Sequence, residues 1–111
     1  MKLGKKELTL KYTISACRKL EQYTNHSIFT MSEYFDDMSI DKMVILLWIG
    51  YLYTDKQFTI DDAAALLDKL QAQGETLTNI ITWISDSFTK DMNGLLGVNT
   101  KEANPESTEK N

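Results

Sequence analysis

Residues 43–53 read Met-Val-Ile-Leu-Leu-Trp-Ile-Gly-Tyr-Leu-Tyr, eleven residues without a charge. With a helical period of 3.6 residues, this stretch places apolar side chains on every face of one helix. Such a helix has to be covered on all sides, and a chain of 111 residues offers few neighbours to cover it. The stretch therefore predicts either the central helix of a small bundle or a helix that is partly an interface for another protein.

The composition is that of a small globular protein. Hydrophobic residues make up 42% of the chain and charged residues 25%, and the length allows one domain but hardly two. After Gly97 the sequence becomes a polar run that contains the only proline and has almost nothing to bury. We expect a single helical domain over residues 1–97 and a disordered tail over residues 98–111.

No membrane span or signal peptide is evident in the sequence. The apolar run is shorter than the ~20 residues that cross a bilayer, and no apolar block follows the lysines near the N-terminus. Cys17 is the only cysteine, so no disulfide forms within the chain. We expect a reducing, cytoplasmic setting, no contact with a membrane, and a buried thiol at Cys17.

Charge is distributed unevenly along the chain. The first twenty residues carry six Lys or Arg against one acidic residue, and the remainder carries a net charge of −9, giving −4 in total. Nucleic-acid-binding proteins usually concentrate basic groups in a stripe with aromatic or polar readers. A short basic start followed by an acidic body lacks that pattern, and we expect no nucleic-acid partner.

The N-terminal residues have the pattern of a hairpin that leads into a helix. Residues 8–12 alternate, with Leu8, Leu10 and Tyr12 on one side, which is the period of a short half-buried strand. This strand is predicted to pair with residues near Leu3 through a turn at residues 4–5. Thr13 is then a suitable N-cap for a helix from residue 14 to about residue 22.

Two capping signals predict the next helices. Thr30-Met31-Ser32-Glu33 has the spacing of a capping box and opens a short helix that ends near residue 38. Ser39 caps the following helix, which has an acidic residue in its first turn and carries the apolar run to about residue 53.

Two further helices complete a mainly α fold. One begins at Thr59, has acidic residues in its first turn, places Ile60, Ala63, Ala64, Leu67 and Leu70 on one face, and ends at Gly74. The last, over about residues 75–92, ends at Asn93-Gly94. Its apolar stripe is formed by Leu77, Ile80, Ile81, Ile84 and Phe88, with Trp83 on the flank. The fold class is a small bundle of four to five helices, preceded by a short N-terminal strand or hairpin.

The chain offers little for catalysis or metal binding. Cys17 and His26 are the only cysteine and histidine, no third group to orient them is evident, and a zinc site cannot be built from two such ligands. The glycines are scattered without a phosphate-binding loop. We expect no enzyme activity, no metal and no cofactor.

Paired carboxylates occur twice, at Asp36-Asp37 and Asp61-Asp62. Neighbouring residues on a helix point about 100° apart and do not converge on one ion. These pairs are better interpreted as charges at helix ends, where the helix dipole acts on them.

Aromatic side chains are the candidates for partner binding. Trp and Tyr are enriched among the residues that anchor protein interfaces. The same residue types also fill cores, and the core is the first interpretation of each one here. As anchors on a partner surface, the candidate residues are Trp48, Tyr51, Tyr53, Trp83 and Phe88.

A strand at residues 8–12 running straight into a helix is followed by an apolar helix, a Thr59-Ile60-Asp61-Asp62 opening and an Ile/Trp-rich helix. This order resembles that of the tail assembly chaperones of long-tailed bacteriophages, over about residues 5–95. Relatives in that family carry glycines at the strand-to-helix junction, where this chain has Thr13 and Ser15.

The resemblance implies a non-enzymatic assembly factor. Proteins of that family coat the long helical tape measure protein, keep it soluble, and help recruit tail tube subunits. They act in the host cytoplasm and are absent from the mature virion. In that family a translational frameshift often extends a short product, and this chain would correspond to the short, unshifted form.

The sequence leaves two other functions open. A small helical DNA-binding regulator would use the basic N-terminus as an arm and would show salt-sensitive DNA retention. A structural tail-completion subunit would instead remain in finished particles. Self-association into a homo-oligomer also stays open, because a small core gains stability from it.

Overall fold

The computed structural model describes residues 1–97, and over these residues the protein is mainly helical. A short antiparallel hairpin precedes five α-helices and one 3-10 turn within this part of the chain. The elements are β1 (Lys2–Leu3), β2 (Lys6–Glu7), α1 (Ile14–Thr24), the 3-10 turn η1 (Ile28–Thr30), α2 (Met31–Asp36), α3 (Ile40–Tyr51), α4 (Ile60–Ala72) and α5 (Leu77–Leu96). The predicted fold class is confirmed, and the predicted disordered tail lies outside the described residues.

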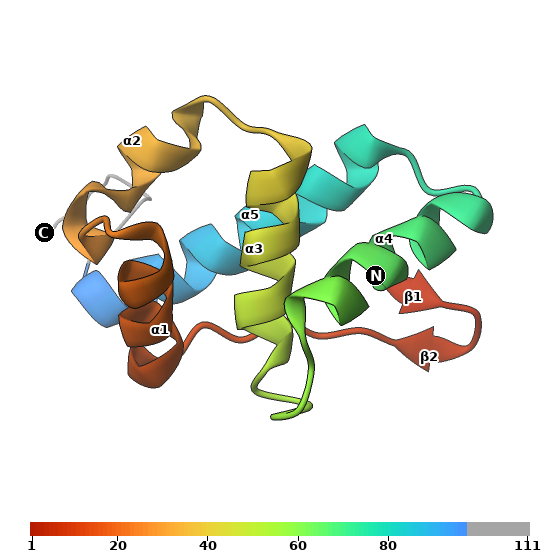
Figure 1. Cartoon of the computed structure of the whole chain (residues 1–111), viewed down its shortest axis with the longest axis horizontal. Helices are drawn as coiled ribbons and strands as arrows, with labels where there is room; N and C mark the ends of the chain where they lie inside the picture. The colour runs from red at the N-terminus through yellow and green to blue at the C-terminus, as the bar shows by residue number, and fades with distance from the viewer. Residues whose placement is uncertain (98–111) are drawn as a thin grey trace, which may run out of the picture.

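Helix α3 lies in the middle of the molecule, with α1, α4 and α5 around it (Figure 1). Its side chains are buried on nearly every face, because these three neighbours cover it. The buried residues of α3 are Met43, Ile45, Leu46, Leu47, Ile49, Gly50 and Tyr51. Of the two alternatives for the apolar run, the structure therefore shows the central helix of a bundle.

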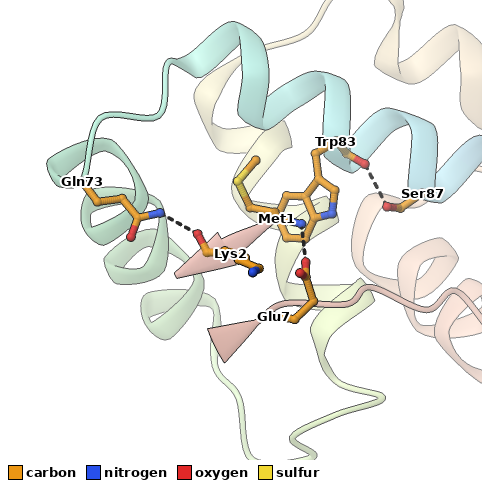
Figure 2. A network of polar contacts seen from close by, with 6 residues as sticks. All are labelled: Met1, Lys2, Glu7, Gln73, Trp83 and Ser87. Carbon is orange, nitrogen blue, oxygen red and sulfur yellow. Dashed lines mark hydrogen bonds and ion pairs between the residues drawn. The ribbon is translucent and has the colours of Figure 1, made fainter. Parts of the chain in front are cut away.

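The hairpin forms at the predicted turn. Lys2 pairs with Glu7 and Leu3 with Lys6, and Gly4 at the turn has a φ of 61°, which a glycine adopts without strain. Figure 2 shows how the hairpin is held, with the amino group of Met1 bonded to the Glu7 carboxylate. The Gln73 side chain, from the end of α4, donates to the Lys2 carbonyl.

The predicted strand at residues 8–12 is right in its alternation, but only its first residue pairs with the hairpin. Leu8, Leu10 and Tyr12 are buried, and the Leu8 amide donates to the Met1 carbonyl at 2.8 Å. Beyond Leu8 the segment crosses the end of α3, where the Lys11 amide donates to the Gly50 carbonyl at 3.0 Å. Carbonyls in the last turn of a helix have no partner within the helix, so Gly50 offers this acceptor.

The predicted N-caps at Thr13 and Ser39 are confirmed, and Thr59, where a helix was predicted to begin, also acts as an N-cap. The hydroxyls of Thr13, Ser39 and Thr59 accept from backbone amides in the first turns of α1, α3 and α4. At α4 the Asp62 carboxylate also accepts from the Thr59 amide, which completes a capping box. Helix α1 ends two residues later than predicted, and Asn25 follows it in the left-handed conformation.

The capping box predicted at Thr30 does not form. Thr30 is the last residue of η1, and its side chain makes no cap hydrogen bond to α2. Its hydroxyl donates to the Ser27 carbonyl at 3.3 Å, while Ser27 caps η1 by accepting from the Phe29 amide. The 3-10 turn thus holds Thr30 outside the extended conformation that an N-cap usually has.

The predicted end of α5 is also wrong. The helix begins after a Thr76 cap and runs through Gly94 to Leu96, and Gly97 takes the left-handed conformation with a φ of 73°. A glycine inside a helix weakens it without ending it, whereas a left-handed residue does end it. Four residues separate Met92 from Leu96, so the added turn continues the apolar stripe.

The buried faces of α4 and α5 differ slightly from prediction. On α4, Leu66 is buried and Ala64 is exposed, because the larger side chain is turned towards the core. On α5, Leu77 is 46% exposed at the start of the helix. Within residues 1–97, no helix is both long and apolar enough to cross a membrane.

Candidate functional site

One end of the bundle carries an apolar groove. It consists of two neighbouring hollows of about 330 and 460 Å³, which share the lining residues Ile28, Phe29, Met92 and Leu96. The first hollow lies between α2 and α5, and the second between α1, η1 and α5. Figure 1 shows these elements together at the end of the long axis away from the β-hairpin. We call the two hollows together the apolar groove.

Large apolar side chains are exposed around this groove. Ile14 is 75% exposed and Phe29 is 77% exposed, and both line the second hollow. Leu95 and Leu96 are 44% and 41% exposed at the end of α5. Scattered single apolar residues are normal on a protein surface, but several around one groove are typical of a binding site.

Local hydrogen bonds place the side chains of the groove. The Glu21 carboxylate of α1 accepts from the Ile28 amide at 2.8 Å, which fixes η1 beside α1. The Ser27 cap then holds the first residues of η1, so Phe29 projects from a fixed backbone. Helix α5 ends at the left-handed Gly97, so Leu95 and Leu96 still lie within its last turn.

The floor of the groove is apolar and rich in methionine. Met31 and Leu46 are each 1% exposed, and Phe88 is packed against the same core. Met38 and Met92 also line the first hollow. Methionine side chains are flexible and polarisable, so a groove lined by them adapts to different apolar occupants.

The predicted aromatic anchors do not form one surface. Trp48 donates its indole NH to the Phe58 carbonyl at 3.1 Å and packs edge-on against Tyr23. Tyr51 is only 6% exposed and packs against Phe58. Both side chains therefore contribute to the packing around α3.

The three remaining anchors lie apart from one another. Tyr53 is 66% exposed just after α3, and it lines neither hollow of the groove. Trp83 points from α5 towards the hairpin and Met1 (Figure 2). Phe88 lines the first hollow, beside the ring of Phe35 at a centroid distance of 6.0 Å. Of the predicted anchors, Phe88 is the one that lines the groove.

Sequence reasoning missed most of the exposed groove residues. Ile14, Phe29, Leu95 and Leu96 were not among the predicted anchors. A signal for the last two was present, because Phe88, Met92 and Leu96 continue one helical stripe at steps of four residues. The Asn93-Gly94 pair concealed this signal, since it has the composition of a helix end.

The residues considered for catalysis are kept apart by their contacts. The buried Cys17 thiol lies 3.8 Å from the Met92 sulfur, and burial raises the pKa of Cys17. The exposed His26 ring instead contacts the Thr24 carbonyl and the ring of Tyr34. Within residues 1–97, no group of three or more His, Cys, Asp or Glu is placed to hold a metal ion.

Another apolar hollow, of about 380 Å³, lies on a different part of the surface. Its lining includes Ile40, Val44, Ala64, Leu67 and Leu77. Ile40 is 61% exposed, so this hollow supplies a comparison surface of similar chemistry.

The apolar groove has the chemistry of a helix-binding surface. Amphipathic helices bind in such grooves through apolar side chains spaced along one face. In the comparisons with known proteins, no family model, curated protein or solved structure matches this chain.

Proposed function

We propose that this protein is a tail assembly chaperone of a long-tailed bacteriophage, and that it binds apolar helical segments of the tape measure protein in the apolar groove. The single observation that carries the proposal is the exposure of Ile14, Phe29, Leu95 and Leu96 around one groove. The resemblance in the order of elements supplies the identity of the partner.

A helix is the occupant that suits the groove best. The α5 wall runs from Ser85 to Leu96, about three helical turns or ~17 Å. The hollows are open to solvent and apolar, and an amphipathic helix buries one stripe in such a groove while its polar face stays in water. A long helical protein with exposed apolar stripes aggregates unless these stripes are covered.

Residues 98–111 do not have the sequence of an occupant for the groove. Their only apolar side chains with helix-forming or strand-forming character are Val98 and Ala103. Two such residues cannot form a stripe that matches the groove. In this proposal the occupant belongs to a partner protein.

Many copies of this protein bound along one tape measure protein give strong overall binding from weak individual contacts. Weak contacts also allow release when tube subunits polymerise around the tape measure protein. In this proposal the protein acts in the host cytoplasm, helps bring tail tube subunits to the complex, and is absent from finished particles. Its net charge of −4 keeps the coated complex from associating with itself.

The test is co-expression with the tape measure protein of the same phage, with the soluble fraction of that protein as the measurement. Ile14→Asp places a charge at the groove and is expected to abolish solubilisation. Ile40→Asp is the matched control, because Ile40 also begins a helix and is exposed but lies outside the groove. Circular dichroism of both variants establishes that each retains its helices.

A second pair of variants tests whether the partner binds the groove or an aromatic anchor predicted from sequence. Phe29→Asp is expected to abolish solubilisation and Tyr53→Asp to leave it intact, since both side chains are exposed and only Phe29 lines the groove. Equal solubilisation by Ile14→Asp and wild type would refute the groove as the binding site. Retention of the protein in purified particles would favour a tail-completion subunit, and salt-sensitive retention on DNA would favour a regulator.

A further inference from the structure

The margin of the apolar groove formed by α2 is acidic. Asp36 and Asp37 are exposed there, and residues 28–39 contain no Lys, Arg or His. Neither carboxylate is in an ion pair within residues 1–97, where the ion pairs are Met1–Glu7 and Lys11–Asp91.

These carboxylates stand at the edge of the groove. Phe35 and Met38 both line the first hollow, and Asp36 and Asp37 lie between them in the chain. Asp36 is also four residues after Ser32, another lining residue, so the two share a side of α2.

One basic side chain approaches this margin from α3. The Lys42 ammonium group donates to the carbonyls of Tyr34 and Asp37, at 2.8 and 2.9 Å, and lies 4.5 Å from the centroid of the Tyr34 ring. Its charge balances one of the two carboxylates, and its bonds are made with backbone carbonyls. A net negative charge therefore remains along the α2 margin.

The other walls carry balanced charges. On α5, the exposed Asp86 and Lys90 flank the lining residues with opposite signs. On α1, Arg18 and Glu21 both line the second hollow, and they also have opposite signs. The groove is thus acidic along one margin and close to neutral along the others.

We infer that the segment bound in the apolar groove is an amphipathic helix with lysine or arginine along one margin of its apolar stripe, and that this margin faces Asp36 and Asp37. The inference rests on the proposed function and adds the chemistry of the partner segment. Because only one margin is acidic, the charge also selects which of the two directions the helix takes in the groove. Complementary charges at a rim contribute mainly to association rate and orientation, and the apolar stripe supplies most of the affinity.

The test uses three synthetic helical peptides of about five turns that share one Leu/Phe stripe. They carry Lys, Gln or Glu along one margin of that stripe, and binding to the full chain is measured by fluorescence anisotropy. The Lys peptide is expected to bind about fivefold more tightly than the Gln peptide, as two exposed ion pairs provide, and the Glu peptide more weakly still. Raising the salt to about 1 M is expected to remove the difference, because the Debye length falls to ~3 Å.

A matched pair of double variants tests whether Asp36 and Asp37 are the carboxylates that favour the Lys peptide. Asp36→Asn with Asp37→Asn is expected to reduce binding of the Lys peptide to that of the Gln peptide. Asp61→Asn with Asp68→Asn removes the same charge from the exposed side of α4 and is expected to leave the preference unchanged.

The outcomes separate the two proposals. Equal binding of all three peptides, lost in Ile14→Asp, overturns the basic margin and leaves the groove as the binding site. Tighter binding of the Glu peptide, or an equal effect of both double variants, also overturns the inference. Failure of every peptide to bind, together with solubilisation that is insensitive to Ile14→Asp, refutes the proposed function itself.

Discussion

Replacing Gly50 with alanine is expected to destabilise the protein, although the same change usually stabilises a helix. Gly50 lies in α3 under the ring of Tyr12, and an added Cβ would lie 2.6 Å from the ring carbon Cζ and 2.7 Å from the hydroxyl oxygen. The ring is fixed in place, because its hydroxyl donates to the Leu46 carbonyl at 2.7 Å and its edge packs against Phe88 at a centroid distance of 5.1 Å.

The magnitude follows from opposing contributions. Alanine gains ~1 kcal/mol over glycine in a helix interior. Overpacking of a fixed core costs ~1–3 kcal/mol. Displacement of the Tyr12 ring also weakens a buried hydrogen bond worth ~1 kcal/mol and an aromatic contact worth ~1 kcal/mol. We expect a net loss of about 2 kcal/mol in the free energy of unfolding.

Urea unfolding followed by far-UV circular dichroism measures this loss, with Gly94→Ala as the matched control. Gly94 is also inside a helix, but nothing lies within 4 Å of an added Cβ, so a gain of about 0.5–1 kcal/mol is expected. In a Tyr12→Leu background, Gly50→Ala is expected to become neutral or stabilising, which a double-mutant cycle detects as coupling. A stabilising effect of Gly50→Ala in the wild-type background would refute the reasoning.

Three further predictions concern buried polar groups and caps. Burial raises the pKa of Tyr12, so the folded protein keeps a proton that the unfolded chain loses above pH ~10. The free energy of unfolding should therefore fall as the pH rises past that value. Urea titrations of Tyr12→Phe should show a smaller fall. Burial also raises the pKa of Cys17, so iodoacetamide should alkylate the native thiol more slowly than the thiol in urea, and equal rates would contradict its burial. Thr59→Ala should cost ~1 kcal/mol in urea unfolding and Thr30→Ala less than ~0.5 kcal/mol, because only Thr59 accepts a cap hydrogen bond; equal losses would contradict this difference.

Helix starts were predictable from sequence where the signal is local. Thr13, Ser39 and Thr59 each cap the helix that the sequence assigns to them, because a cap needs only a hydroxyl and the next few amides. At Thr30 the same pattern was misleading, since Ser27 starts a 3-10 turn that already uses Thr30 as its last residue. Two overlapping local signals competed there, and the sequence alone does not rank them.

The partner of the N-terminal segment was not predictable from sequence. The alternation of Leu8, Leu10 and Tyr12 correctly indicates which side is buried. A strand neighbour and a free helix carbonyl satisfy the same backbone amides, and the choice depends on where the end of α3 lies. The pairing of Lys11 with Gly50 joins residues far apart in the chain, so short-range patterns carry no information about it.

The position of the candidate site follows from which apolar side chains are buried in the core and which stay exposed. A helix that is apolar on every face suggests an interface, but α3 is covered by its neighbours, and that covering takes up Tyr51 and most of Trp48. Exposed apolar surface then remains where helices begin or end, because fewer neighbouring turns cover a side chain there. Ile14 begins α1 and Leu96 ends α5, and these ends meet beside η1. In this small bundle the surface available to a partner is therefore set by the helix ends, which are the features that sequence patterns locate least well.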